Sequence, residues 1–143
     1  MPENARPDPE KIRQKVQFLR EALRQLAVIR ERGETELLED PILQAAAIRY
    51  LQISIEAILD TANHIIAREG LGLPKTYQEA LELLIQHGIL PSEKAGDFAA
   101  MVGFRNRAVH LYQQLEPTEV YKMLEEDLGD FEIFIRSMTE RYF

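Results

Sequence analysis

Apolar residues recur along this chain at intervals of three and four, the spacing that places side chains on one face of an α-helix. The first stripe follows this spacing through Ile12, Val16, Leu19, Leu23 and Leu26. Asp8 and Pro9 have the character of an N-cap and a first-turn proline, and Gly33 ends the pattern. The sequence therefore predicts a long amphipathic helix that begins near Pro9 and ends near Gly33.

A second helix is predicted from Asp40 and Pro41 to about Glu69, where glycines interrupt the pattern. Its apolar residues fall on two stripes rather than one. The first contains Leu43, Ala46, Tyr50, Ile53 and Ala57, and the second contains Ala47, Leu51, Ile55, Ile58, Ala62 and Ile65. A helix that is apolar on most sides is expected at the centre of a bundle, covered by neighbours on several faces.

Two shorter helices follow the central one. Thr76 and Glu79 form a capping box, T-x-x-E, at the start of a helix that closes at Gly88. Ser92 has the character of an N-cap for a fourth helix, which we expect to continue to Tyr112.

Pro117 and Thr118 begin a fifth predicted helix. Its apolar register runs through Val120, Leu124, Leu128, Phe131, Ile135 and Met138. The pattern gives no convincing strand, so the predicted fold is an all-α antiparallel bundle of about five helices. We expect residues 1–143 to form a single domain, with residues 1–9 as a flexible N-terminus.

Composition narrows the classes of function. The chain has 143 residues, 45% hydrophobic content and no cysteine, which excludes disulfides and thiolate metal sites. Its net charge of -7 argues against a broad basic surface for nucleic acid, so any anion site must be local. Neither a targeting segment nor an apolar run of about 20 residues is evident. We therefore expect a cytoplasmic protein with no membrane partner.

A polar segment, "RNRAVHLY" at residues 105–112, interrupts the apolar character of the fourth helix. At about 100° per residue, one stripe spans roughly 80° of that helix. It contains Phe98, Val102, Arg105, Val109 and Tyr112. Asn106 and His110 form a second file beside it, because side chains four residues apart are neighbours on a helix.

Arg105 on a core-directed stripe has two interpretations. A guanidinium there is costly unless it is paired or reaches water through a cleft. A charged residue that interrupts an apolar packing stripe is more common at functional sites than elsewhere, so this position indicates a functional groove. The alternative is a structural ion pair with Glu56 or Asp60 of the central helix, and helix geometry alone gives the two readings similar weight.

The motif also carries a resemblance. In "MVGFRNRAVHLY", the spacing Arg105-x4-His110-x-Tyr112 resembles the R-x4-H-x-Y signature of HepT-like toxins in the HEPN superfamily. The stretches "AAAIRYLQISIEAILDTANHIIAREGLGLPKTYQEALELLIQHGIL" and "EPTEVYKMLEEDLGDFEIF" are also similar to this family. The resemblance covers roughly residues 10–140, and residues 1–10 and the Arg-rich end of the first helix have no clear counterpart in it.

The resemblance implies a metal-independent endoribonuclease with no cofactor, the toxin of a type VII-like toxin-antitoxin pair. Its partner would be a small MNT-type nucleotidyltransferase antitoxin. By the same resemblance, Arg105 and His110 are catalytic, Asn106 supports them, and the antitoxin silences the toxin by adenylylating Tyr112. A non-catalytic HEPN module that binds nucleotide or a partner nucleotidyltransferase is the alternative, although such a module has no evident need for the histidine.

The residue types suit RNA cleavage on physical grounds. Histidine, with an ordinary pKa of about 6.5, serves as a base or an acid near neutral pH. Arginine supplies a permanent, forked cation for phosphate. Because the motif holds one histidine and the reaction needs two proton transfers, we expect a homodimer with a composite active site.

Other polar residues have weaker claims. Arg107 points away from the predicted core and is a possible RNA contact. His64 follows Asp60 by four residues, a spacing compatible with a metal pair, but a buried, hydrogen-bonded histidine is the favoured reading. His87 next to a helix end is expected to be structural. The Arg-rich run of the first helix is expected to form a solvated face, to guide RNA toward the groove or to meet an acidic partner, and its members are Arg20, Arg24, Arg30 and Arg32.

Overall fold

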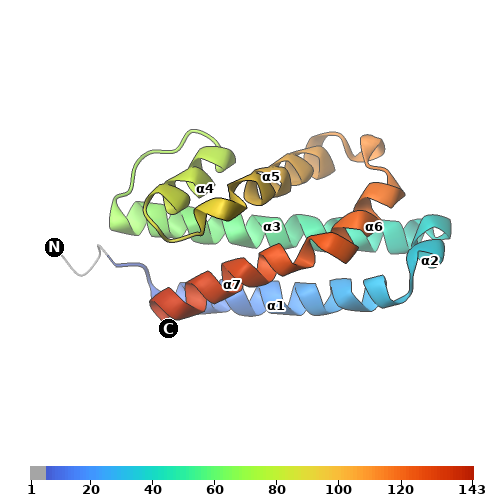
Figure 1. Ribbon diagram of the computed structural model, residues 1–143, viewed down its shortest axis with the longest axis horizontal. Helices are drawn as coiled ribbons and strands as arrows, with labels where there is room; N and C mark the ends of the chain where they lie inside the picture. The colour runs from blue at the N-terminus through green and yellow to red at the C-terminus, as the bar shows by residue number, and fades with distance from the viewer. Residues whose placement is uncertain (1–5) are drawn as a thin grey trace.

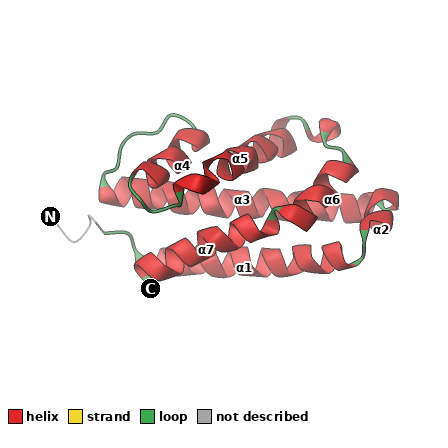
Figure 2. Cartoon of the chain, in the orientation of Figure 1, coloured by secondary structure: helices red, strands yellow, loops and turns green. Residues whose placement is uncertain are grey.

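A computed structural model describes residues 6–143, and within that range the chain is helical with no strand (Figure 2). The α-helices are α1 (Pro9–Glu31), α2 (Glu34–Glu39), α3 (Pro41–Glu69), α4 (Tyr77–Gln86), α5 (Ala95–His110), α6 (Pro117–Glu126) and α7 (Leu128–Tyr142). Two short 3-10 turns are η2 (Ser92–Lys94) and η3 (Tyr112–Gln114). The predicted all-α bundle is confirmed.

The two longest helices, α1 and α3, are antiparallel and begin with the same chemistry. The Asp8 carboxylate accepts from the backbone N–H of Glu10, and the Asp40 carboxylate accepts from the N–H groups of Ile42 and Leu43. In each helix the next residue is a proline. Proline has no backbone N–H, and at the first helical position this costs no hydrogen bond, because an N–H there would have no acceptor within the helix. α3 then stops at Gly70, which adopts the left-handed conformation with φ 66°.

α3 is the central helix, as its two apolar stripes predicted. It contacts α1, α4, α5 and α6 (Figure 1). By length and composition alone, α3 would suffice to cross a membrane, although no uninterrupted apolar run marks it in the sequence. Half of its most apolar stretch is buried inside the bundle, which is the environment of a core helix.

Other helices pack around the pair formed by α1 and α3. α4 and α5 lie against α3 and against each other, while α6 and α7 lie across α1 (Figure 1). α7 ends beside the beginning of α1, where the Arg13 guanidinium lies 4.7 Å from the centroid of the Phe143 ring. This arrangement leaves the end of α5, which carries the polar motif, free to reach the surface.

One short helix was not predicted. α2 begins after Gly33, whose φ of 91° lets the chain turn sharply between α1 and α2. Leu37 is the buried residue of α2 and is fully enclosed. A six-residue helix with one buried position has too few apolar repeats to produce a detectable period.

The predicted fifth helix is two helices, α6 and α7. They meet at Asp127, which has φ -110° and ψ -6°, and the backbone N–H of Asp130 donates to its carbonyl at 3.0 Å. The apolar register continues across this joint, with Leu124 and Leu128 both buried on either side of it. Periodicity therefore could not reveal the break.

The fourth predicted helix begins and ends differently from expectation. Ser92 does not cap it by a side-chain hydrogen bond and instead opens the 3-10 turn η2. α5 ends at His110, two residues before Tyr112. The chain leaves the helix there because Leu115 returns to the core, and Pro117 then fixes the start of α6.

Of the N-terminal segment expected to be flexible, residues 1–5 lie outside the described residues. The remaining part contacts the bundle. Pro7 is buried, and the carbonyl oxygen of Arg6 accepts a hydrogen bond from Nε of Arg68 at 2.9 Å. Asp8 then caps α1.

Candidate active site

The C-terminal half of α5 carries the polar motif and leaves the core as it proceeds. Phe98 and Val102 on the predicted stripe are 1% and 4% exposed. Val109 and Tyr112, placed on the same stripe, are instead 40% and 49% exposed. The stripe is therefore a packing surface only in its first half, and Arg105 lies where it passes from core to solvent.

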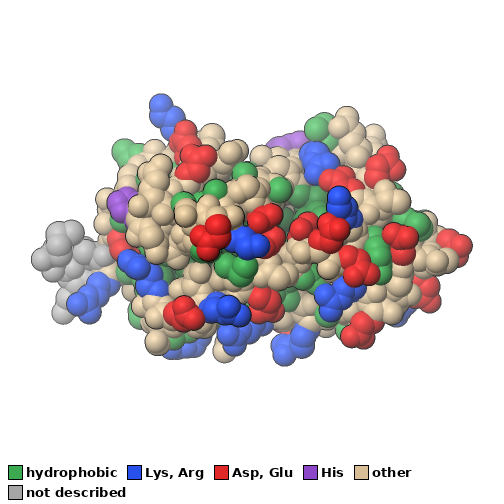
Figure 3. Space-filling model, viewed as in Figure 1, with side chains coloured by type: hydrophobic (Ala, Val, Ile, Leu, Met, Phe, Trp, Pro, Cys, Tyr) green, Lys and Arg blue, Asp and Glu red, His purple; other side chains and the backbone are tan. Residues whose placement is uncertain are grey.

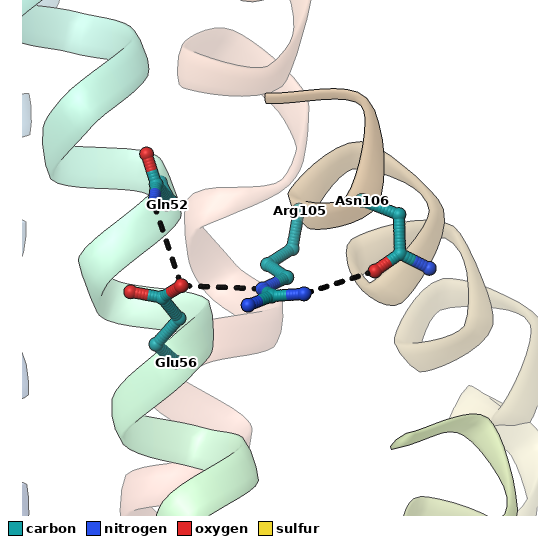
Figure 4. A network of polar contacts seen from close by, with 4 residues as sticks. All are labelled: Gln52, Glu56, Arg105 and Asn106. Atoms are coloured by element: carbon teal, nitrogen blue, oxygen red, sulfur yellow. Dashed lines mark hydrogen bonds and ion pairs between the residues drawn. The ribbon is translucent and has the colours of Figure 1, made fainter. Parts of the chain in front are cut away.

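Arg105 is held on three sides by α3, α4 and its own helix. Its Nε donates to Oε2 of Glu56 at 3.2 Å, and its Nη1 donates to Oδ1 of Asn106 at 3.2 Å (Figure 4). The guanidinium carbon lies 5.0 Å from the centroid of the Tyr77 ring, within the range of a cation–π interaction. The Arg105 side chain is 16% exposed, so this is a largely enclosed cation with matched partners.

The pairing alternative for Arg105 is thus realised with Glu56 and not with Asp60. Asp60, one turn further along α3, pairs with Lys15 of α1 at 3.2 Å. Glu56 is itself contacted by Gln52, whose Nε2 lies 3.4 Å from the same Oε2 atom (Figure 4). The ion pair and the polar file beside the stripe therefore coexist.

Asn106 and His110 lie one turn apart on α5, and both are exposed. His110 is the last residue of the helix, and the following N–H, from Leu111, closes the turn on the carbonyl of Arg107 at 2.7 Å. The imidazole is therefore presented at the rim of the bundle beside the amide that contacts Arg105. This arrangement offers a fixed cation and an accessible proton-transfer group on one helix end.

Tyr112 lies beyond α5, in η3, and is exposed. Its hydroxyl has no hydrogen-bond partner among residues 6–143, whereas the hydroxyls of Tyr121 and Tyr142 donate to Glu125 and Glu69. An unengaged, accessible phenol two residues after the histidine is available for chemistry or contact with another molecule.

Arg107 is turned away from Arg105 and ties α5 to α6. Its Nη1 donates to Oε2 of Glu119 at 3.0 Å, its Nη2 donates to Oε1 of the same residue, and the guanidinium lies 5.9 Å from the Phe104 ring centroid. An RNA contact by Arg107 would have to compete with this bidentate pair. That assignment stays a prediction.

The remaining candidates are placed outside this site. His64 accepts a hydrogen bond at Nε2 from the backbone N–H of Asp8, 2.9 Å away, and its possible metal partner Asp60 pairs with Lys15. Over residues 6–143 no three His, Asp or Glu side chains gather in an arrangement that would hold a metal ion. His87 is exposed at the C-cap of α4.

The charge on the face of the molecule seen in Figure 3 follows the expectation from composition. Acidic and basic side chains are interspersed over the face seen in Figure 3, with no broad basic area.

Two contributors to the site, Tyr77 and Gln52, were not found from sequence. Tyr77 follows a helix cap and Gln52 lies on the central helix, and no spacing links either to Arg105, so only the packing of α3 and α4 against α5 could identify them.

Comparison with known proteins identifies this architecture. Residues 19–138 match the family described as "Ribonuclease HepT-like". The "mRNA nuclease HepT" of Shewanella oneidensis is 38% identical over 97 residues, which cover 68% of this chain and 73% of that protein. The "tRNA nuclease HepT" of Aphanizomenon flos-aquae is 31% identical over 91 residues, covering 64% of this chain and 62% of that protein.

Solved structures agree with these matches. The tri-AMPylated HEPN toxin of Shewanella oneidensis in complex with its MNT antitoxin superposes with a TM-score of 0.86 and 30% identity, covering 92% of this chain and 98% of that one. A toxin-antitoxin complex with AMP-PNP superposes with a TM-score of 0.84 at 28% identity, covering 92% and 99%. The HEPN-like bundle and the expected ribonuclease class are confirmed, and the chain belongs to the HepT-like ribonuclease family.

Proposed function

We propose that this chain is a metal-independent endoribonuclease that acts as the toxin of a toxin-antitoxin pair in the cytoplasm. Arg105 and His110 are its catalytic residues, and Asn106 supports them. The observation that carries the proposal is the state of Arg105: its guanidinium is enclosed and fixed through Nε, beside an exposed asparagine and histidine on the same helix end.

The reaction proposed is internal transesterification of RNA. A base takes the proton of the 2'-hydroxyl, and the 2'-oxygen attacks the adjacent phosphorus. The bond from phosphorus to the 5'-oxygen breaks, and an acid gives that oxygen a proton, which leaves a 2',3'-cyclic phosphate and a 5'-hydroxyl. Arg105 stabilises the negative charge on the phosphate oxygens, and His110 performs proton transfer. Arg105 thus supplies the cation and His110 supplies one of the two proton-transfer groups, without a metal ion.

A homodimer with a composite active site completes this chemistry. One chain contributes one motif histidine, whereas the two proton transfers need two groups. The surface beside His110 supports self-association, because Val109, Leu111 and Tyr112 are 40%, 47% and 49% exposed. A two-fold contact through this patch would bring the two motifs together and cover its apolar side chains.

An MNT-type nucleotidyltransferase is the proposed antitoxin, and Tyr112 is its target. The Shewanella oneidensis toxin similar to this chain is AMPylated and bound to an MNT antitoxin. In the proposed modification the Tyr112 oxygen attacks the α-phosphorus of ATP, the hydroxyl proton is lost and pyrophosphate leaves. The attached AMP brings bulk and negative charge to the end of α5, where it repels RNA phosphate.

RNA cleavage in the presence of EDTA tests the catalytic assignment. Wild type should cleave a mixed RNA substrate and arrest growth on expression, while Arg105→Ala and His110→Ala should lose both effects. Equal activity in all three proteins would contradict the assignment, and loss of wild-type cleavage with EDTA would contradict metal independence. RNA binding without cleavage by any of them would favour a non-catalytic HEPN module.

A further inference from the structure

Arg105 and Arg107 are two residues apart and both pair with a glutamate, but they do so through different atoms. Arg107 uses Nη1 and Nη2 together, so Glu119 covers the tip of its guanidinium. Arg105 uses Nε for Glu56 and Nη1 for Asn106, and among residues 6–143 its Nη2 has no hydrogen-bond partner. In Arg107, the carboxylate of Glu119 occupies both terminal nitrogens of the guanidinium. In Arg105, the contact through Nε fixes the guanidinium and leaves N–H donors of Nη1 and Nη2 available.

The position of Glu56 explains how the fixing is achieved. It projects from α3 toward the side of the Arg105 guanidinium, while Gln52 contacts the same carboxylate oxygen from one turn away (Figure 4). The two side chains of the pair are 16% and 31% exposed for Arg105 and Glu56, so water competes weakly for this contact. The aromatic face of Tyr77 limits rotation out of the plane.

We infer that Glu56 is a positioning residue for Arg105, holding Nε so that Nη2 and the remaining N–H of Nη1 are directed at an RNA phosphate. This inference rests on the proposed ribonuclease site. A guanidinium already oriented before substrate binds does not have to be ordered in the transition state, so its hydrogen bonds to the phosphate oxygens contribute more to the rate. Glu56 itself contacts neither substrate nor reacting atoms.

Two substitutions at Glu56 separate positioning from a merely structural role. In Glu56→Ala, kcat on a short RNA should fall at least about tenfold, because the guanidinium loses its fixed orientation. KM should not rise, because the substitution also removes a negative charge near the bound phosphate. Glu56→Gln should recover kcat to within about threefold of wild type, because the amide oxygen still accepts from Nε.

Asp60→Ala is the matched control. Asp60 lies one turn further along α3 and is also paired across helices, with Lys15. Its loss should leave kcat unchanged, because the pair that it breaks joins α3 to α1 and does not include Arg105. Equal loss of kcat in Asp60→Ala and Glu56→Ala, or failure of Glu56→Gln to recover activity, would overturn the positioning role.

The failure of this inference differs from failure of the proposed function. If Arg105→Ala is inactive but Glu56→Ala cleaves as wild type, only the positioning role is lost. If Arg105→Ala cleaves normally, the ribonuclease site itself is wrongly assigned. A measurement that needs no cleavage is proton exchange at Nε of Arg105 by NMR, which should be slow in wild type and Glu56→Gln and fast in Glu56→Ala. Equal exchange in all three would refute the contact in solution.

Discussion

The backbone N–H of Asp8 donates a hydrogen bond to Nε2 of His64, 2.9 Å away, and so joins the start of α1 to α3. An acceptor nitrogen carries no proton, so the imidazole in this contact is neutral with its hydrogen on Nδ1. Burial lowers the pKa of His64 below its ordinary value of 6.5, and the neighbouring charges of Lys11 and Arg68 lower it further, against an opposing effect of Asp8.

This contact makes stability depend on pH in a defined direction. With the pKa lowered in the folded protein, the unfolded chain takes up a proton first as the pH falls. The stabilisation is therefore complete above about pH 6.5 and is lost as the pH falls through the lower folded pKa. Between pH 7.5 and 5, wild type should lose more stability than His64→Gln, which has no imidazole to take up a proton. The same change in the free energy of unfolding with pH in the two proteins would contradict this.

Replacement of Arg105 by lysine should abolish most activity although the charge is kept. A lysine side chain has a single nitrogen. It therefore cannot donate to Glu56 through one nitrogen, as Arg105 does through Nε, while two other nitrogens bind the phosphate. We expect kcat to fall by at least about tenfold, equivalent to roughly 1.4 kcal/mol of transition-state stabilisation. Arg136→Lys, on the exposed side of α7, should cleave RNA as wild type. Full activity in Arg105→Lys would show that charge alone suffices.

The beginning of the central helix depends on one side chain. The Asp40 carboxylate accepts from the backbone N–H groups of Ile42 and Leu43, at 3.0 and 3.2 Å. Asp40→Ala should lower the free energy of unfolding by about 1 kcal/mol, whereas Asp40→Asn should stay close to wild type because its amide oxygen also caps. Urea denaturation measures both. An asparagine variant as unstable as the alanine variant would show that capping is not the cause.

Local chemistry made the framework of this fold predictable. Asp8 with Pro9 and Asp40 with Pro41 marked the two long helices correctly, because a cap acts on residues next to it in sequence. The division at Asp127 was not predictable, because the apolar register is the same on both sides of it.

The site was only half accessible from the sequence, for a related reason. The polar file of Asn106 and His110 follows from helix geometry alone. The partner of Arg105 does not, since Glu56 and Asp60 both lie on α3 and only packing of that helix against α5 and α1 assigns one to each cation. The exposure of Val109 was also missed, because a helical stripe does not reveal where a helix leaves the core.

The apolar patch beside His110 should be the homodimer contact. Leu111 is 47% exposed, and an aspartate there would place a charge in the proposed interface. Leu111→Asp should run as a monomer in analytical ultracentrifugation and lose RNA cleavage. Leu73→Asp changes a leucine that is 95% exposed between α3 and α4, and it should remain dimeric and active. A wild-type protein that is monomeric at micromolar concentration while cleaving RNA would exclude the composite site.

Tyr112 should be the residue through which the antitoxin silences the toxin. Its exposed hydroxyl has no partner among residues 6–143, and phenylalanine removes only that oxygen. Tyr112→Phe should therefore keep nuclease activity, resist silencing by the co-expressed nucleotidyltransferase, and show no AMP adduct by mass spectrometry. Tyr121→Phe is the control, because the Tyr121 hydroxyl is already bonded to Glu125 at 2.6 Å, and it should be modified as wild type. If Tyr112→Phe carries AMP on another residue and is still silenced, the assignment is refuted. The negative charge of the AMP would then act from that other residue and not from Tyr112.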